Sequence, residues 1–379
     1  MRFDFTEDQE SLRGEARRFL ASHCGRETVR AVLDSDEPYS RELWAEMGRL
    51  GWTGVALPEA FGGSGAGYLE LCVLAEEMGR VLAPTPFSSS IYLAAELILR
   101  EGDDAQTTDW LPRLAAGTAI GTLALAEGPG AADWGLARTR ATPLGGGHYA
   151  LTGVKQPVPD GLAADVAIVS ARLSGELGLF LVDLHQPEVT RHPEPGLDES
   201  RPLGRLSFSG ARCARLGSAG RAALDAALDR AAVLFAFEQI GGAEAALSMA
   251  VGHARQRFAF GRAIGSFQAI KHKLADMYAE LELARSNAYF AAWALASGDA
   301  VLGEAAACAR LSASRAYFDC AKECVQVHGG MGFTWEADPH LHYRRATLLN
   351  AVIGGQARWR EVLVSRLQQK DASAREGTP

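Results

Sequence analysis

The sequence is poor in several features that would place it in a common class of protein. Its formal net charge of -8 argues against a nucleic-acid partner, because such binding needs clustered Lys and Arg. No apolar run approaches the length that spans a bilayer, so no membrane partner is expected. The acidic and polar opening MRFDFTEDQE predicts that a secretory signal is absent. With 47% hydrophobic and 22% charged residues, the composition favours a globular enzyme or binding protein of the cytoplasm.

Cysteine is also scarce. The chain has six, with no CxxC pair and no spacing typical of a disulfide framework: positions 24, 72, 213, 308, 320 and 324. Cys320 and Cys324 share one face of an expected helix. We favour buried, small apolar side chains in a reducing compartment over a redox or metal role.

Motifs for simple metal, nucleophile and dinucleotide chemistry are missing. Five residues in and after the stretch QVHGGMGFTWEADPH are possible metal ligands: His328, Glu336, Asp338, His340 and His342. The last two are only two residues apart and face different ways on a helix, and no HxxxH pair occurs, so no metal site is predicted. No GxSxG elbow and no GxGxxG after a strand is present.

Three regions differ in pattern. Residues 1–118 read as helices, beginning with a capping box at Thr6 and Gln9. Residues 119–221 hold short runs rich in Val, Leu, Ile and Thr between Gly, Pro and Asp, with no helical pattern between them. That region predicts a small antiparallel β-barrel or sandwich rather than a parallel sheet.

Residues 222–370 are again helical, and 371–379 resemble a disordered tail. A seam of apolar residues at steps of three and four predicts a long helix over 268–297, formed by Ile270, Leu274, Met277, Leu281, Ala284 and Ala288. Further helices are expected at about 300–326 and 341–369, which makes a four-helix bundle. The expected fold is therefore mainly α with a central β domain.

The stretch RQRFAFGRAIGSFQ lies between two of these helices. Arg257 ends one helix, an aromatic-glycine turn follows, and Gln268 begins the next. A guanidinium there can bind an anion such as pyrophosphate, or it can cap the end of its own helix. Taken alone, the stretch favours the capping role, which is common for an arginine at a helix C-terminus.

Three motifs in order, PEAFGG, RxxFGxxIGxFQ and QxxGGxGFTxExxxxxxYRRA, closely resemble the acyl-CoA dehydrogenase family over nearly the whole chain. The resemblance implies an N-terminal helical domain, a middle β domain and a C-terminal four-helix bundle. It also implies FAD as cofactor, an acyl-CoA substrate oxidised to the 2,3-enoyl-CoA, assembly as a dimer of dimers, and an electron-transfer flavoprotein as acceptor.

The family's reaction needs a base to remove the proton α to the thioester carbonyl. The resemblance places that base, usually a Glu, at Ile353, and its alternative position at Ala231. Neither side chain accepts a proton, so no catalytic residue is assigned. Asp229 and Glu238 are the acids that a displaced base would use.

The positions that would hold this chain's own flavin are altered as well. The resemblance assigns five of them, all lacking the family's hydroxyl or aromatic side chain: Ala126, Ala132, Pro157, Pro159 and Gly355. Proline offers neither an N–H nor an aromatic face.

By contrast, the positions that in this family reach a neighbour's FAD are retained: Arg257, Phe260, Gln268, Gln326, Gly329 and Gly330. This asymmetry predicts a subunit without a base that completes a partner's FAD site in a heterotetramer. The stretches PVPDG and HGGMGFTWE resemble the branch of the family that acts on steroid side-chain CoA thioesters. The alternatives are a self-sufficient homotetrameric dehydrogenase with a displaced base, and a flavin monooxygenase or flavin-free binding protein on the same scaffold.

Overall fold

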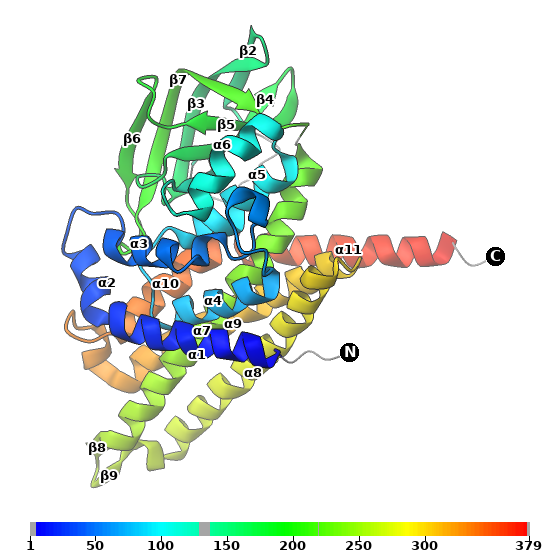
Figure 1. Cartoon of the computed structure of the whole chain (residues 1–379). Coiled ribbons are helices and arrows are strands. Elements are labelled where there is room, and N and C mark those ends of the chain that lie inside the picture. The colour runs from blue at the N-terminus through cyan, green and yellow to red at the C-terminus, as the bar shows by residue number, and fades with distance from the viewer. Residues whose placement is uncertain (1–4, 129–136, 219, 377–379) are drawn as a thin grey trace. The chain divides into compact units, whose positions relative to one another are not determined.

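The computed structural model describes residues 5–128, 137–218 and 220–376 (Figure 1). They form two compact units, each built from separated stretches of the chain. Unit 1 contains the residues up to 26, residues 68–83 and the residues from 232 onward. Unit 2 contains residues 27–67 and 84–231. Because both units take residues from the N-terminal helical region, the boundaries expected at 118 and 221 stay predictions.

The centre of unit 2 is a seven-stranded sheet. Its strands are β1 (Gly121–Ala124), β2 (Arg140–Gly145), β3 (His148–Pro159), β4 (Val166–Leu173), β5 (Glu176–Asp183), β6 (Val189–Glu194) and β7 (Leu203–Arg215). Strand β4 pairs with both β2 and β5, so β4, β2, β3, β7 and β5 close into a ring, as expected for a small barrel.

The barrel that the sequence predicts is present, but its sheet is mixed, because two of its pairings are parallel. β1 runs parallel to β4 over four residue pairs, and β2 meets β4 in parallel at Arg140 and Arg172. Both pairings join strands that are far apart in the sequence, where no tight hairpin imposes an antiparallel direction. The alternation of apolar and polar residues is the same in either case, so the sequence pattern does not reveal it.

Helices complete unit 2. They are most of α2 (Arg26–Leu33), then α3 (Arg41–Arg49), α5 (Glu96–Glu101) and α6 (Asp104–Ala115), with short turns η1 (Trp52–Gly54) and η2 (Glu59–Phe61) and the π-helix η3 (Ser88–Ala95). Gly51, just after α3, has φ +73°, a left-handed conformation in which glycine commonly ends a helix. The buried η3 packs on β1, where a Cβ on Gly121 would lie 2.4 Å from the Cβ of Ala94.

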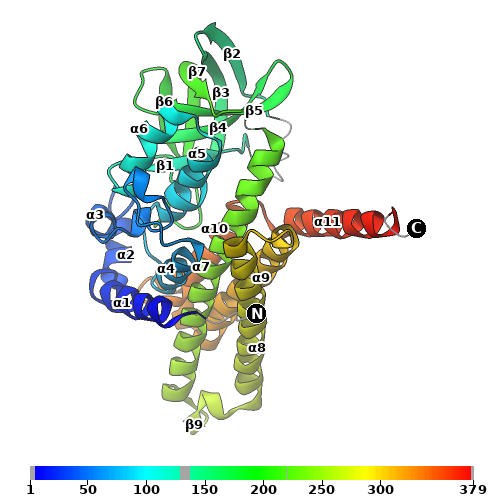
Figure 2. The same ribbon diagram turned by 45° about the vertical axis from the view of Figure 1, so that its right-hand side comes forward.

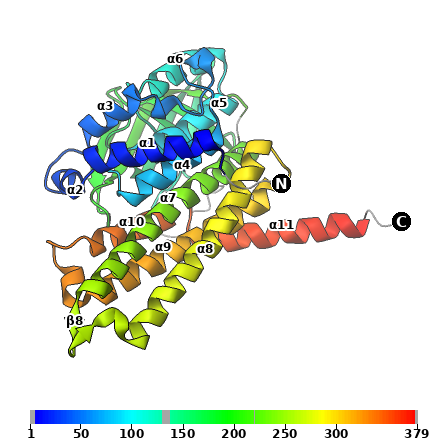
Figure 3. The same ribbon diagram turned by 60° about the horizontal axis from the view of Figure 1, so that its bottom comes forward.

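Unit 1 is helical. Its helices are α1 (Glu7–His23), α4 (Tyr68–Arg80), most of α7 (Arg221–Gln256), α8 (Gln268–Ser297), α9 (Leu302–His328), α10 (Pro339–Ala351) and α11 (Gln356–Glu376). Figures 2 and 3 show the long helices α7, α8 and α9 side by side. The capping box at Thr6 and Gln9 is present. In the predicted seam of α8, Met277, Leu281, Ala284 and Ala288 are buried.

The stretch 341–369, expected to be helical, is broken into α10 and α11. Gly354 has φ +91°, which a helix does not allow, and it leaves four residues between the two helices. Helix α11 then continues to Glu376, past the expected boundary at 370, because DASARE contains good helix formers. Residues 377–379 of the expected tail lie outside the described residues. No helix in the described part of the chain is long and apolar enough to cross a membrane.

A cluster of buried charges fastens α1, α4, α7 and α8 together in unit 1. The fully buried Glu76 of α4 accepts bonds from Arg13 at 2.6 Å and from Arg285 at 2.7 Å. Arg285 also bonds Glu244 at 2.8 Å, and Arg80 bonds the same carboxylate at 3.0 Å. Each carboxylate is therefore matched by two guanidinium groups, the arrangement that buried charges require.

Candidate functional site

The loop between α7 and α8 presents three of the predicted cofactor-binding residues. A two-stranded hairpin, β8 (Phe258–Ala259) and β9 (Arg262–Ala263), lies at the ends of these helices (Figure 2). Its turn is Phe260–Gly261, with φ +53° and +79°. Phe260 is 95% exposed. A left-handed backbone is costly for phenylalanine, and the exposed ring makes an edge-to-face contact with Phe267 at a centroid distance of 6.3 Å.

Arg257 and Gln268 flank this hairpin. Arg257 directly follows α7, and Gln268 is the first residue of α8, as predicted. Both side chains are exposed. The Arg257 guanidinium has no hydrogen bond or ion pair with any described residue, so it does not cap α7. It is available for an anion from outside the chain.

The other three predicted residues lie at the end of α9. Gln326 is exposed in the last turn, and Gly329 follows with φ +63° and ψ -142°, a conformation essentially restricted to glycine. A Cβ on Gly329 or Gly330 would meet no atom of the chain within 4 Å. Two of the glycines therefore have open space above their backbone. Gly332 differs, since a Cβ there would lie 2.6 Å from the Val325 carbonyl oxygen.

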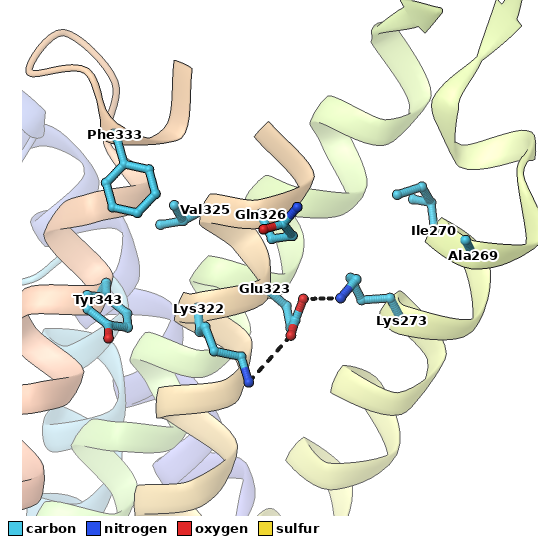
Figure 4. Close-up of a pocket in the computed structure, with 9 residues that line it drawn as sticks. All are labelled: Ala269, Ile270, Lys273, Lys322, Glu323, Val325, Gln326, Phe333 and Tyr343. Carbon is cyan, nitrogen blue, oxygen red and sulfur yellow. Dashed lines mark hydrogen bonds and ion pairs between the residues drawn. The ribbon is translucent and has the colours of Figure 1, made fainter. Parts of the chain in front are cut away.

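A cavity of about 520 Å³ adjoins these residues (Figure 4). Ile270 and Lys273 of α8 line one side, and Phe333 and Tyr343 line the other. Gln326 lies between them with Glu323, which pairs with Lys273. The cavity thus combines aromatic and apolar walls with an exposed amide and a charged rim, features typical of a ligand-binding site.

We call Arg257, Phe260, Gln268, Gln326, Gly329 and Gly330 the helix-end surface. This surface offers an unbonded guanidinium, exposed amides, backbone that no side chain covers and an exposed ring. These groups suit an FAD molecule that approaches from outside the chain. Phe333 is 77% exposed beside it, and Met331 and Trp335 are exposed as well. Such apolar exposure is typical of a surface that a partner covers.

The predicted base positions offer no proton acceptor. Ile353 is 1% exposed, and its apolar side chain packs in the core at the end of α10. In unit 2, Ala231 is fully buried in α7. Of the displaced candidates, Glu238 is buried in unit 1, where its charge acts on the buried guanidinium of Arg310. Asp229 is half-buried in unit 2.

The positions that the resemblance assigns to this chain's own flavin offer few polar groups to a cofactor. Pro157 and Pro159 lie in β3, and the β3–β7 ladder is interrupted between Lys155 and Val158. Neither proline supplies a donor, and Ala126, two residues after β1, supplies no hydroxyl. Gly355, in the loop before α11, also lacks a side chain. Ala132 lies outside the described residues.

The sequence does not predict that Lys155, which precedes these prolines in β3, is buried. The Lys155 ammonium is fully buried and donates to Glu127 at 2.7 Å, to Ser170 at 2.9 Å and to the Leu125 carbonyl at 3.1 Å. Burial raises the pKa of Glu127, but the bonds from Lys155 and Thr139 outweigh it and bring the pKa to about 2. The pattern of a strand gives no sign that its one lysine points inward.

Two further polar clusters are also invisible in the sequence. Asp160, at the end of β3, is buried and bonds the buried Arg201 at 2.9 Å, and Arg201 also donates to Ser88 at 2.9 Å. In unit 1, His253 near the end of α7 stacks on His328 at the end of α9, with ring centroids 4.1 Å apart. Burial, with the neighbouring charges of His328 and Arg257, lowers the pKa of His253.

The candidate metal ligands do not converge. His342 is buried, and its Nδ1 lies 3.1 Å from the Tyr317 hydroxyl oxygen. The ring of His340 stacks on Trp335. Among the described residues, no three His, Cys, Asp or Glu side chains gather in a way that could hold a metal. The described cysteines are all free thiols, and burial raises the pKa of Cys320 and Cys324 to about 12.

Comparison with known proteins gives the family. The model of the acyl-CoA dehydrogenase N-terminal domain matches residues 6–118, and that of the C-terminal domain matches residues 218–367. Acyl-CoA dehydrogenase IpdE2 of Mycobacterium tuberculosis is 33% identical over 344 residues, covering 90% of this chain and 91% of its own length.

Two solved structures share the fold over almost the full length. One is a single-residue variant of the Tcur3481–Tcur3483 steroid acyl-CoA dehydrogenase, with a TM-score of 0.88, 32% identity and coverage of 97% of this chain and 99% of its own. The other is the ChsE4–ChsE5 complex from Mycobacterium tuberculosis, with a TM-score of 0.87, 28% identity and full coverage of both chains. This chain belongs to the acyl-CoA dehydrogenase family, FAD-dependent oxidoreductases that act on CH–CH bonds.

Proposed function

We propose that this chain is the subunit of a heteromeric acyl-CoA dehydrogenase that lacks the catalytic Glu and completes the FAD site of a partner subunit. The observation that carries the proposal is a contrast within unit 1. The family's base position holds Ile353, buried and without a proton acceptor, whereas the helix-end surface keeps exposed groups suited to FAD.

Each group of the helix-end surface has a role in this proposal. The Arg257 guanidinium binds the pyrophosphate, which it meets without losing an existing partner. Gln268 and Gln326 offer amides to the polar edges of the cofactor. Gly329 and Gly330 let the backbone approach it closely, since no side chain covers them. When bound, FAD supplies the acceptor for the hydride from the β-carbon of the acyl group.

The partner supplies the base and the main part of the cofactor site. In the proposed assembly, an α2β2 tetramer, the altered positions Pro157, Pro159 and Ala126 of this chain hold no flavin. The acyl-CoA substrate belongs to the steroid side-chain class, which the likeness to a steroid acyl-CoA dehydrogenase supports. An electron-transfer flavoprotein accepts the electrons; a structure described as an electron-transferring flavoprotein of Acidaminococcus fermentans matches this chain with a TM-score of 0.89 and 29% identity.

Counting flavin tests the proposal. The chain is purified alone in excess FAD, and again after co-expression with a subunit that carries Glu at the position of Ile353. We expect almost no retained FAD alone, and about one FAD for each pair of subunits in the co-purified assembly. About one FAD per protomer in the isolated chain, with oxidation of an acyl-CoA, contradicts the proposal.

A second candidate function rests on Glu238. This acid is 4% exposed on α7, in unit 1, and a self-sufficient homotetramer would use it as the displaced base. The charge of Glu238 already acts on Arg310, so a structural role explains its burial. The two candidates differ in a measurable way, because only the second loses turnover, without releasing flavin, when Glu238 is replaced by Gln or Asp229 by Asn.

A further inference from the structure

Two histidines join the ends of the helices that carry the helix-end surface. His253 lies one helical turn before Arg257, whose backbone N–H donates to the His253 carbonyl at 2.8 Å. His328 is the last residue of α9 and directly precedes Gly329. Their rings stack at 4.1 Å with an interplanar angle of 26°. The contact therefore links the Arg257 end of α7 to the Gln326–Gly330 end of α9.

The orientation of His328 is set by its own helix. Its Nδ1 lies 2.7 Å from the Cys324 carbonyl oxygen, close enough for that nitrogen to donate. A Cβ on Gly332 would lie 3.2 Å from the Cβ of His328, so the following turn packs closely against it. These two contacts hold the side chain of His328 in place. Stacking on His328 in turn orients the ring of His253.

We propose that the stacked pair of His253 and His328 is a positioning element that aligns Arg257 with the Gln326–Gly330 turn while the rings are not both charged. This inference rests on the proposed function, in which the two helix ends bind one FAD together. A proton on each ring places two positive charges face to face beside the guanidinium of Arg257. The rings then separate, and the two parts of the helix-end surface lose their common alignment.

The charges around the pair favour this behaviour. The groups that act on His253 are His328 and Arg257, both able to carry positive charge. The Cys324 thiol lies 3.7 Å from His328, and burial raises the pKa of that thiol to about 12, so it offers no compensating negative charge. The turn Gly329–Phe333 has no titratable side chain.

The direction of the pH dependence follows from the lowered pKa of His253. The unfolded or locally opened histidine binds a proton more readily than the stacked one, so protons favour opening. The stack is stable above the ordinary histidine pKa of about 6.5 and weakens as the pH falls through that value. Alignment of the helix-end surface is therefore lost on the acid side.

Hydrogen exchange read by mass spectrometry tests the inference without requiring flavin. The wild-type chain and His253→Phe, which keeps a flat ring but no titratable nitrogen, are compared at the same pH in peptides covering 248–262 and 322–334. At about pH 5.5 we expect the wild type to exchange at least about fivefold faster in both peptides, and at about pH 7.5 equally fast. His272→Phe, an exposed histidine on α8, is the control and should follow the wild type.

Retention of FAD by the co-purified assembly is measured in parallel. We expect the wild type to release FAD at about pH 5.5 and His253→Phe to retain it. His328→Phe provides a second stacked variant in case the first does not fold. Equal exchange of the wild type and these variants at both pH values overturns the inference. If the wild type exchanges faster than the variants at the acid pH although the co-purified assembly never binds FAD, that result supports the positioning pair and refutes the proposed function.

Discussion

Gly241 of α7 lies against Glu76 of α4 so closely that a Cβ on Gly241 would be 1.8 Å from the Glu76 carbonyl oxygen. The contact is reciprocal, since a Cβ on Gly79 of α4 would lie 1.8 Å from the carbonyl oxygen of Glu238 on α7. The two helices therefore cross backbone to backbone. On the same helix α4, the side chain of Glu76 accepts a bond from Arg285 of α8.

Replacing Gly241 by Ala should force α4 and α7 apart. We expect a loss of at least about 3 kcal/mol in the free energy of unfolding, because the clash is with backbone that cannot turn away. Equilibrium unfolding in urea measures this loss of stability. Gly252→Ala is the matched control on the same helix, where a Cβ meets nothing, and it should stabilise by about 0.5–1 kcal/mol. Equal effects of the two substitutions would contradict the close crossing.

The pair of Glu127 and Lys155 makes stability depend on pH in the acid range. The folded-state pKa of Glu127, about 2, lies below its ordinary value of 4.5, so the unfolded chain binds the proton more readily. The contribution of Glu127 is present above about pH 4.5 and is lost as the pH falls toward 2. Glu127→Gln should therefore cost about 3 kcal/mol at neutral pH and progressively less from about pH 5 to 3.

The control for that titration is Glu37→Gln, which removes an exposed ion pair with Arg41. Exposed pairs contribute about 0–1 kcal/mol, so this variant should track the wild type at every pH. A difference between wild type and Glu127→Gln that stays constant down to about pH 3 would show that the carboxylate has no lowered pKa.

Gly330 and Gly332 separate cofactor binding from folding. Gly330→Ala places its Cβ in open space, so the melting temperature of the isolated chain should not change. FAD retention by the assembly should nevertheless fall by about tenfold, because the added methyl lies where the cofactor approaches. Gly332→Ala should instead destabilise the isolated chain, since its Cβ meets the Val325 carbonyl at 2.6 Å. Unchanged FAD retention in Gly330→Ala would remove this residue from the cofactor surface.

Glu238→Gln should leave turnover of the co-purified assembly within about twofold of the wild type, because the base comes from the partner. Steady-state oxidation of an acyl-CoA measures this. A fall of about 100-fold or more, without loss of FAD, would identify Glu238 as a base and favour the self-sufficient enzyme. Asp229→Asn is measured in the same way, because Asp229 is the other acid that a displaced base would use, and turnover retained in both variants would exclude the self-sufficient enzyme.

Local signals in the sequence predict the helices well. Thr6 and Gln9 form the capping box and Gln268 begins α8, because each signal depends on a few neighbouring residues. The break at Gly354 is harder to predict. A glycine inside a helical pattern is tolerated in many helices, and only the positive φ found here shows that it ends one.

Contacts between distant residues are beyond such signals. The parallel pairing of β1 with β4, the inward lysine at Lys155 and the stack of His253 on His328 each join residues that only the folded chain brings together. The helix-end surface is an intermediate case. Its residues are named by the family motifs, but their shared exposure at the ends of α7, α8 and α9 follows from the structure alone.

The discontinuous composition of unit 1 sets an order for folding during synthesis. Unit 2 is complete once residue 231 has left the ribosome, whereas the rest of unit 1, which packs on α1 and α4, begins at residue 232. Glu76 and its partner Arg285 are 209 residues apart, which corresponds to about 10–40 s at ordinary elongation rates. During that interval Arg13 can already neutralise Glu76, because it is translated first. The N-terminal helices of the nascent chain therefore contain a counter-ion for Glu76 before the later helices of unit 1 have been synthesised.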